Sequence, residues 1–360
     1  MKSLKENFQK AHLLIIGSGI IGKFNALELS ELGYQITIID PTQHINSSNA
    51  ALGLLMGNMY QKRKGRGWNL RKQSIELWPK WLKFLQKFNN NIDIEKPLIQ
   101  LTTNEEAFRK LRRFVNENND NDLKILENNS IFLKNINKAF QTKNIKGMIS
   151  FKDGRINAIS LLKTLDICLK NKKVNFLKDK IIKIRKFNKQ WIATTKTKKE
   201  IKSDVIILCN SLNIIDLIDD ISHNIKLKPV LGQAIELGIN DAEVDLLSLP
   251  RHFNINGKNI IPISKNKLII GSTDEYSTKP EKKILEELTN FIEKKPTWLV
   301  KGHITKKWFG IRSRPDGEPS PIMKNLENGL IICTGFYKNG ILLAPACSKW
   351  VANEIKNYLY

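Results

Sequence analysis

Three glycines near the amino end have the spacing of a dinucleotide-binding turn. Gly17, Gly19 and Gly22 form GxGxxG inside "LLIIGSGIIGKFNALELSELGYQITIID", and Asp40 ends that stretch. The first glycine of such a motif permits a tight turn, the second lets backbone N–H groups approach a pyrophosphate, and the third packs helix on strand. The acid can accept hydrogen bonds from both ribose hydroxyls. The pattern predicts a dinucleotide site but does not choose between NAD and FAD.

A second stretch, near the carboxyl end, is also suited to an anion. "GFYKNGILLAP" contains a glycine turn, Lys338, a second glycine and an apolar run that can open a helix. A helix amino end and a cation both attract negative charge. We therefore expect the two stretches to hold the two ends of one long cofactor.

The elements that must position these motifs follow from hydrophobic periodicity. Residues 12–16 read as a buried strand, 20–32 as a helix and 35–39 as a second strand, which together make a β-α-β unit. The segments "NIIPI" and "KLIIGS" are joined by a tight polar turn and predict a hairpin. Helical spacing recurs at residues 68–88, 104–118, 157–171, 280–294 and 341–357.

The length of the chain predicts two structural units. At 360 residues it exceeds the size of roughly 250–300 residues at which single hydrophobic cores stop growing. Segments of β-α-β character at the start, middle and end are separated by helix-rich and strand-rich inserts. We therefore expect two units that are interleaved in sequence.

The chain is strongly basic, with 59 Lys and Arg against 35 Asp and Glu, a formal net charge of +24. Such a charge is compatible with binding to nucleic acid, because Lys and Arg release counterions from phosphate. The lysines are spread over nearly every segment beside abundant Asn and Ile, however, and this favours a general compositional bias. A nucleic-acid partner is thus disfavoured and left open.

Cysteine usage indicates a reducing compartment. Cys168, Cys209, Cys333 and Cys347 form no CxxC pair and have no histidine at ligand spacing, so neither a disulfide framework nor a metal site is expected. No apolar run approaches the length of about 20 residues that a membrane-spanning helix needs. GxSxG, HExxH and P-loop motifs are absent from the sequence. We expect a cytoplasmic protein without a membrane span, and an oligomer is possible.

Seven segments follow one another in a characteristic order: GxGxxG with Asp40, "SSNAALGLLMG", "DVIILCNS", "KPVLGQ", "IIPI…KLIIGSTDE", "WFGIRSRPDGEPSP" and "GFYKNGILLAPA". This order resembles the D-amino-acid-oxidase-like family of FAD-dependent oxidoreductases, and within it the glycine oxidase branch. The resemblance implies an α/β fold, with a Rossmann-like FAD-binding domain of three layers interleaved with a smaller α+β substrate-binding domain on an antiparallel sheet. The expected ranges are 1–82, 146–225 and 301–360 for the first domain and 83–145 and 226–300 for the second.

The resemblance also implies which residues hold FAD. The glycine turn and Asp40 would bind the AMP half, the stretch around Ser47 to Leu54 the flavin half, and Ile181 the adenine through its backbone. The carboxyl-terminal stretch would meet the isoalloxazine ring. The expected cofactor-binding residues are Gly17, Ser18, Gly19, Ile20, Ile21, Gly22, Asp40, Pro41, Ser47, Ser48, Leu52, Gly53, Leu54, Ile181, Gly335, Phe336, Tyr337, Asn339, Gly340, Ile341 and Leu342.

Two further residues are expected to be catalytic by the same resemblance. Arg312 matches the arginine that grips the substrate carboxylate in a bidentate fork, and Lys338 would stabilise negative charge on reduced flavin. The implied reaction is hydride transfer from the amine-bearing carbon of a small amine or amino acid, such as glycine, sarcosine or a D-amino acid, to flavin N5. Oxygen or another acceptor would reoxidise the flavin. Tyr276, Trp308 and Tyr337 are candidate walls of the substrate pocket.

The sequence also departs from the family pattern. Lys338 stands where arginine is usual, Ser313 replaces a proline, and the hairpin segment from Ile261 to Ile263 lacks the usual tyrosine and arginine. Two alternatives stand beside amine oxidation. One is a flavin-dependent oxidase that modifies tRNA, in which the net charge of +24 would serve RNA binding. The other is a flavin-binding protein with little turnover, which fits the changes at Lys338 and Ile263.

Overall fold

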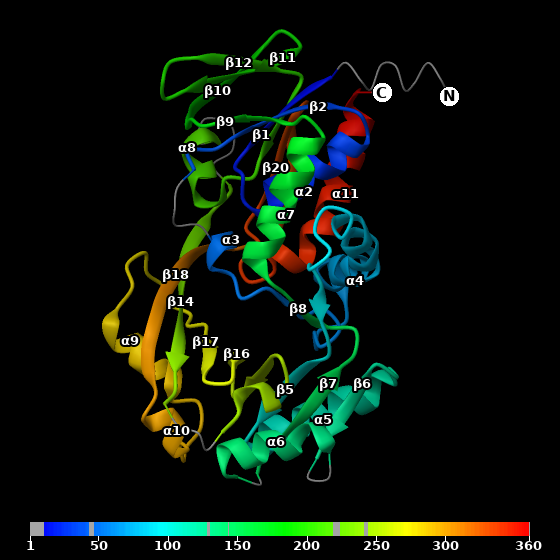
Figure 1. Cartoon of the computed structure of the whole chain (residues 1–360). Helices are drawn as coiled ribbons and strands as arrows, with labels where there is room; N and C mark the ends of the chain where they lie inside the picture. The colour runs from blue at the N-terminus through cyan, green and yellow to red at the C-terminus, as the bar shows by residue number, and fades with distance from the viewer. Residues whose placement is uncertain are drawn as a thin grey trace.

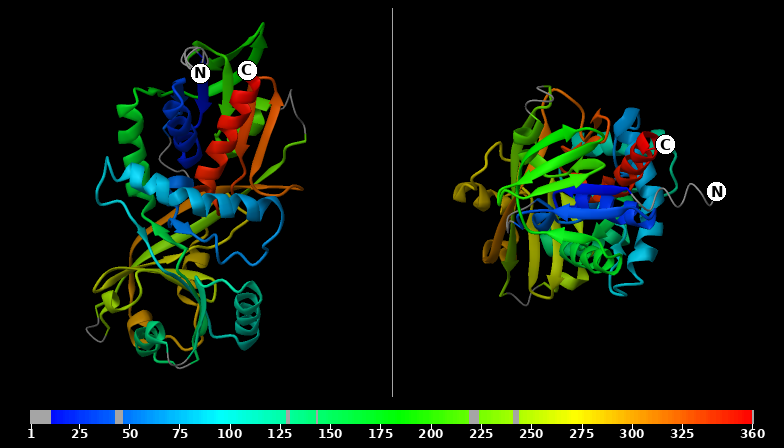
Figure 2. Two further views of the ribbon diagram at one scale, coloured as in Figure 1. Left: turned by 90° about the vertical axis from the view of Figure 1, so that its right-hand side faces the viewer. Right: turned by 90° about the horizontal axis from the view of Figure 1, so that it is seen from above.

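The computed structural model describes residues 11–42, 47–127, 130–142, 144–218, 224–240 and 244–359. Within them, most strands belong to two large sheets that occupy opposite ends of an elongated molecule (Figure 1). A view turned by 90° about the vertical axis shows the same division into two lobes (Figure 2, left).

The first large sheet has six strands, five of them parallel and one antiparallel at the edge. Its central strands are almost wholly apolar and buried, as expected for a parallel sheet that is covered on both faces. Its order is β19 (Ile322–Glu327), β20 (Leu330–Thr334), β13 (Val205–Leu208), β1 (His12–Ile16), β2 (Gln35–Ile39) and β9 (Asn175–Leu177).

Three helices cover one face of this sheet, and a small antiparallel sheet covers the other (Figure 1). Leu13 packs toward the helices, whereas its neighbour Leu14 packs against Ile184 and Trp191 of the small sheet. These three layers confirm the predicted α/β class. The helices are α2 (Ile20–Glu31), α7 (Ala158–Asn171) and α11 (Gly340–Leu359), and the small sheet consists of β10 (Ile181–Phe187), β11 (Gln190–Thr195) and β12 (Glu200–Ser203), with α8 (Ile215–Ile218) and η1 (Ser211–Ile214) beside it.

The second large sheet has eight strands and is mainly antiparallel. Helices α6, α9 and α10 pack on one face around Phe140, whose ring lies 5.4 Å from that of Trp298, and α5 packs on the other face. Its order is β18 (His303–Pro315), β14 (Leu227–Gly238), β17 (Lys267–Gly271), β16 (Lys258–Ser264), β15 (Phe253–Ile255), β5 (Leu98–Thr102), β7 (Lys146–Ser150) and β6 (Leu123–Leu126). The helices nearby are α5 (Glu105–Asn118), α6 (Ile131–Phe140), α9 (Lys282–Glu286), α10 (Thr297–Val300), η2 (Leu246–Ser248) and η3 (Glu287–Thr289).

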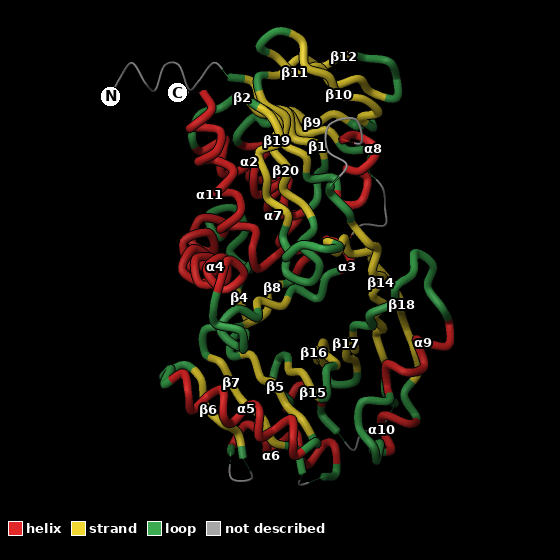
Figure 3. The backbone as a smooth tube through the Cα atoms, turned by 180° about the vertical axis from the view of Figure 1, so that it is seen from behind, coloured by secondary structure: helices red, strands yellow, loops and turns green. Residues whose placement is uncertain are grey.

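The region between the two lobes brings distant segments together. The long strands β14 and β18 pair from Leu227 with Pro315 to Gly238 with His303 and run from one lobe toward the other (Figure 3). The other elements at this junction are α3 (Ser47–Ala50), α4 (Gly65–Leu85) and a small sheet of β3 (Leu54–Leu55), β8 (Gly154–Ile156) and β4 (Ile94–Glu95).

The structure differs from the expected elements in two respects. The β-α-β unit, the hairpin and the helices near 68–88, 104–118, 157–171 and 341–357 are confirmed, but the predicted helix 280–294 is wrong. Only the short α9 and η3 form there. The strands β7 and β18, which fall in the ranges expected for the cofactor domain, pair instead within the eight-stranded sheet.

Candidate functional site

The glycine turn between β1 and α2 has room for backbone only. Gly17 has a φ of +107°, and a Cβ there would lie 2.8 Å from the backbone carbonyl of Cys209. A Cβ on Gly22 would lie 1.9 Å from the carbonyl oxygen of Gly17. The first turn of α2 is thereby packed closely onto the loop, and the amino end of a helix in such a position is suited to an anion.

Two polar side chains border this turn. The carboxylate of Asp40 accepts a hydrogen bond from the Ser18 N–H at 2.8 Å, and the Ser48 hydroxyl accepts one from the Ile20 N–H at 3.0 Å. Both therefore lie at the amino end of α2, although Asp40 follows β2 and Ser48 belongs to α3. The tertiary structure thus joins two segments that the sequence analysis assigned to one cofactor.

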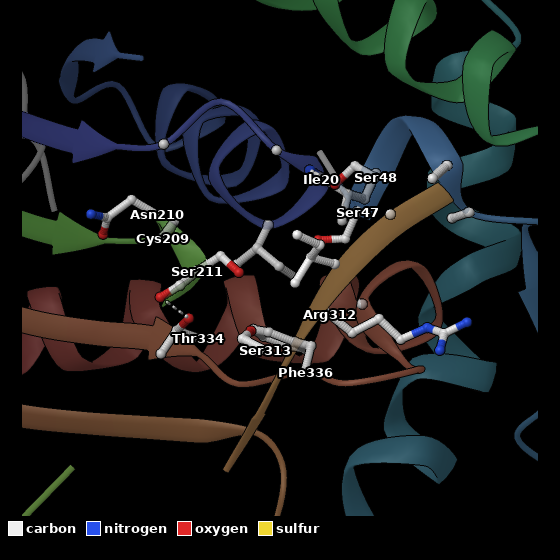
Figure 4. A pocket seen from close by; sticks show the side chains of 18 of the residues that line it. Ile20, Ser47, Ser48, Cys209, Asn210, Ser211, Arg312, Ser313, Thr334 and Phe336 are labelled. Carbon is white, nitrogen blue, oxygen red and sulfur yellow. Dashed lines mark hydrogen bonds between the residues drawn. The ribbon is translucent and has the colours of Figure 1, made fainter. Parts of the chain in front are cut away.

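A cavity of about 430 Å³ begins at this turn and reaches the strands of the second lobe. Figure 4 shows Ile20, Ser47 and Ser48 on one side of it, Ser211 and Thr334 on another, and Arg312 extending from β18. The predicted residues that line it are Gly17, Gly19, Ile20, Ile21, Asp40, Pro41, Ser47, Ser48, Leu52, Gly53, Leu54, Ile181, Arg312, Phe336, Tyr337, Lys338, Gly340 and Ile341. Five predicted residues do not line it: Ser18, Gly22, Gly335, Asn339 and Leu342.

Several lining residues were not predicted. Ser211 has a φ of +58°, and its carbonyl accepts a bond from the Thr334 hydroxyl at 3.4 Å (Figure 4). Gly232, Asn259 and Ser272 enter from the second lobe. Ser211 and Gly232 belong to the motif segments "DVIILCNS" and "KPVLGQ", but the sequence alone does not indicate that these residues border the cavity.

Arg312 is the main cation on the side of the cavity that the second lobe forms. Its side chain is 15% exposed, and its guanidinium donates to the Thr273 carbonyl at 3.1 Å, Asp274 Oδ1 at 2.9 Å and Ser272 Oγ at 2.6 Å. Burial lowers the pKa of Arg312, and the charge of Asp274 opposes this shift. A Cβ on Gly232 would lie 2.1 Å from Arg312 Nη2, so the glycine leaves the room that the guanidinium occupies.

The two residues predicted to be catalytic share a carboxylate that the sequence analysis did not single out. Asp274 forms ion pairs with both Arg312 and Lys338, and it also accepts a hydrogen bond from the Tyr337 hydroxyl at 3.3 Å. Lys338 comes from the loop before α11, whereas Asp274 follows β17. The resulting group of charges is built from segments far apart in the sequence.

A buried network fixes the segment that carries Asp274. The Gln233 side chain donates to both oxygens of Glu275, at 3.0 and 3.1 Å, and the Gln233 N–H donates to Thr273 Oγ1 at 2.8 Å. Leu231 and Glu275 exchange two backbone hydrogen bonds, at 2.8 and 2.9 Å. Asp274 is therefore held in place by its neighbours as well as by its ion pairs.

The three candidate aromatic walls have different positions. Tyr337 lines the cavity, but Trp308 does not, and its indole donates instead to the Ala50 carbonyl at 3.2 Å. Tyr276 is 70% exposed and lies in a neighbouring groove beside Arg314. The prediction for Trp308 and Tyr276 is wrong, because both side chains lie outside the cavity.

Comparison with known proteins identifies the family. Residues 12–354 match the family described as DAO, FAD dependent oxidoreductase. The chain belongs to this family. It is therefore an FAD-dependent oxidoreductase.

Individual relatives cover nearly the whole chain. Glycine oxidase of Geobacillus kaustophilus is 24% identical over 95% of this chain and 92% of its own length. The structure of glycine oxidase from Bacillus cereus superposes with a TM-score of 0.81 at 22% identity, covering 97% of this chain and 95% of that one. L-proline dehydrogenase of P. horikoshii gives a TM-score of 0.78 at 17% identity, covering 97% and 94%. These structures share the fold.

The cavity fits the cofactor of the family. The glycine turn at Gly17 and Gly22, the amino end of α2 and the adjacent Asp40 suit a pyrophosphate and a ribose. The cavity continues from there to the start of α11, as one long ligand requires. Within the described ranges, no group of three or more His, Cys, Asp or Glu side chains could hold a metal ion. Likewise, no helix in the described part of the chain is long and apolar enough to cross a membrane.

Proposed function

We propose that this FAD-dependent oxidoreductase oxidises the C–N bond of a small amino acid or amine, such as glycine, sarcosine or a D-amino acid. The observation that carries the proposal is the position of Arg312, a largely buried cation at the end of the cavity remote from the dinucleotide turn. A guanidinium in this setting is suited to a carboxylate, because its planar fork matches two oxygens. The similarity to glycine oxidases over most of the chain supports the same substrate class.

The donor inventory of Arg312 supports a role in substrate binding. A guanidinium has five N–H donors. Two hydrogens of Nη1 are directed at the Thr273 carbonyl and Asp274, and one of Nη2 at Ser272. Among the described residues, none accepts a hydrogen bond from Nε. The edge formed by Nε and the remaining Nη2 hydrogen is therefore suited to one substrate carboxylate.

In the proposed reaction the chain mainly orients the substrate. Bound FAD supplies the acceptor for the hydride that leaves the amine-bearing carbon as its bond to nitrogen becomes double. Arg312 fixes the carboxylate and with it the direction of the adjacent C–H bond, so positioning contributes more than a protein base. The imino product is hydrolysed in water, and oxygen or another acceptor takes the electrons.

We also propose that the predicted residues that line the cavity bind FAD. The turn at residues 17–22 would receive the pyrophosphate, Asp40 the ribose, and the start of α11 the isoalloxazine end. Lys338 would add positive charge near that end, moderated by its pair with Asp274. A cytoplasmic location stays a prediction.

The test is the visible spectrum of the purified protein followed anaerobically. Glycine, sarcosine, proline, D-amino acids and simple amines are added separately, and bleaching of the flavin bands is recorded. Bleaching by carboxylate-bearing amines supports the proposal, and bleaching by plain amines alone contradicts the role of Arg312. A yellow protein that no amine bleaches would reject amine oxidation and favour the tRNA or low-turnover alternatives. Steep salt dependence on heparin would then point to RNA.

A further inference from the structure

The cluster around Arg312 contains its own carboxylate. Asp274 pairs with Arg312 Nη1 through Oδ1 and with the Lys338 ammonium through Oδ2. Arg312, which lines the cavity, thus has no acceptor for its Nε hydrogen among the described residues, whereas the Lys338 ammonium is paired with a carboxylate of the protein. The side chains of Asp274 and Lys338 are 41% and 47% exposed, so both can be reached from solvent.

We propose that Asp274 is a specificity residue that restricts the site to substrates with a single carboxylate. It does so by neutralising Lys338, which would otherwise offer a second binding point for an anion. This inference rests on the proposed function, since it names the substrate class of the same site. Amines with two carboxylates, such as iminodiacetate and aspartate, are the substrates that it excludes.

The physical reason is the sign of the charge that a second carboxylate would meet. A substrate whose first carboxylate is bound by Arg312 lies near Lys338 and Asp274, because Arg312 and Lys338 both line the cavity and Asp274 pairs with both of them. A second carboxylate there would approach the oxygens of Asp274 and would have to displace them from Lys338. Like charges at such distances repel, and desolvation adds to the cost.

The hydrogen bonds of the residues on either side of Asp274 indicate that it stays in place when the substrate binds. Thr273 and Glu275, on either side of it, are bonded to Gln233, and Glu275 also pairs with the backbone of Leu231. A substrate therefore cannot displace Asp274 by moving its backbone without breaking this buried network. Asparagine has nearly the same shape as aspartate and can still accept from Arg312, so Asp274→Asn removes the charge with little change of geometry.

The experiment measures the binding of two carboxylates that cannot be oxidised. Acetate and malonate are titrated into the FAD-loaded protein at constant ionic strength, and the perturbation of the flavin spectrum gives each Kd. We expect Asp274→Asn to improve malonate binding at least tenfold more than acetate binding, because Lys338 becomes free.

Two variants control this result. Asp316→Asn makes the same change of net charge, but Asp316 pairs with Lys228 at 2.9 Å and not with the cluster, so malonate should gain nothing. The double variant Asp274→Asn/Lys338→Met should lose the gain, because the freed cation is gone. An Asp274→Asn protein without a selective gain for malonate would overturn the proposal, as would an equal gain in Asp316→Asn.

Bleaching of the flavin separates this inference from the proposed function. If iminodiacetate bleaches the wild-type protein as readily as sarcosine does, the role of Asp274 is refuted while amine oxidation stands. If no amine bleaches it, amine oxidation is refuted, and the ratio of the two Kd values still decides the role of Asp274.

Discussion

The two ends of the cavity are built in different ways. The proposed dinucleotide end consists mainly of the backbone of residues 17–22, bordered by Asp40 and Ser48, and a Cβ on Gly22 would overlap the carbonyl oxygen of Gly17 at 1.9 Å. The proposed substrate end carries charged side chains: Arg312 and Lys338 line it, and Asp274, from a third segment, pairs with both. A backbone site tolerates no added atom, whereas a side-chain site can adjust its shape and is sensitive to charge.

Substitution at the dinucleotide end should have the largest effect. In Gly22→Ala the new methyl group meets backbone that cannot move without opening the contact between β1 and α2. We expect the purified protein to lose most of its flavin, measured as the ratio of absorbance at the flavin band to that of the protein, and to unfold at lower temperature. Overpacking of this kind costs roughly 1–3 kcal/mol.

Gly67→Ala is the matched control, because Gly67 also lies in a helix and its Cβ would find the nearest atom at 3.5 Å. It should keep its flavin and its stability. If both variants bind flavin normally, the dinucleotide end is not the rigid backbone site described above.

At the substrate end, removal of the main cation should have the next largest effect. Arg312→Ala should raise KM for a carboxylate-bearing amine by about 10- to 100-fold, since a hydrogen bond to a charged group contributes about 1.5–3 kcal/mol. KM for a plain amine should change far less. Arg314→Ala, on the same strand but exposed, should leave both values nearly unchanged. An equal rise for both kinds of substrate would contradict the assignment of Arg312 to the carboxylate.

The second lobe should also respond to acid through a buried histidine. His252 is 1% exposed, its ring nitrogens have no hydrogen-bond partner among the described residues, and burial together with Arg155 lowers its pKa to about 4. Because the pKa is lower in the folded state, stability present above pH 6.5 is lost as pH falls toward 4. Between pH 7 and 5 this loss is about 2 kcal/mol.

The measurement is urea unfolding of the wild-type protein and of His252→Gln at both pH values. The variant should lose less stability on acidification than the wild type does. An identical loss of stability in the two proteins would show that protonation of His252 does not cause the loss on acidification.

The smallest effect is expected where an added atom meets a flexible side chain. In Gly232→Ala the Cβ would displace the Arg312 guanidinium, whose end can swing aside, so stability should change little while KM rises by about fivefold. Gly238→Ala on the same strand faces His303 instead and should not alter KM. Loss of flavin in Gly232→Ala would show that flavin binding is as sensitive to substitution at this end of the cavity as at the other.

The elements that were predicted correctly depend on local sequence signals, whereas the region of the wrongly predicted helix also makes contacts with distant segments. The β-α-β unit and the hairpin are set by local periodicity and by turn residues, which the sequence displays directly. Where the predicted helix 280–294 is interrupted, side chains of other segments bond its carbonyl groups. The Gln233 side chain donates to the Glu281 carbonyl at 3.0 Å, and the Asn256 side chain to that of Phe291 at 2.8 Å. No pattern within residues 280–294 could indicate these partners.

By itself, the sequence determined the glycine turn, because glycine spacing over six consecutive residues specifies its backbone conformation. It also determined the family resemblance, which depends on the order of the motifs. Only the tertiary structure decided that Asp274 lies between Arg312 and Lys338 and that β18 pairs with β14. Contacts between residues far apart in the chain depend on how sheets and loops pack, and local spacing carries no record of that packing.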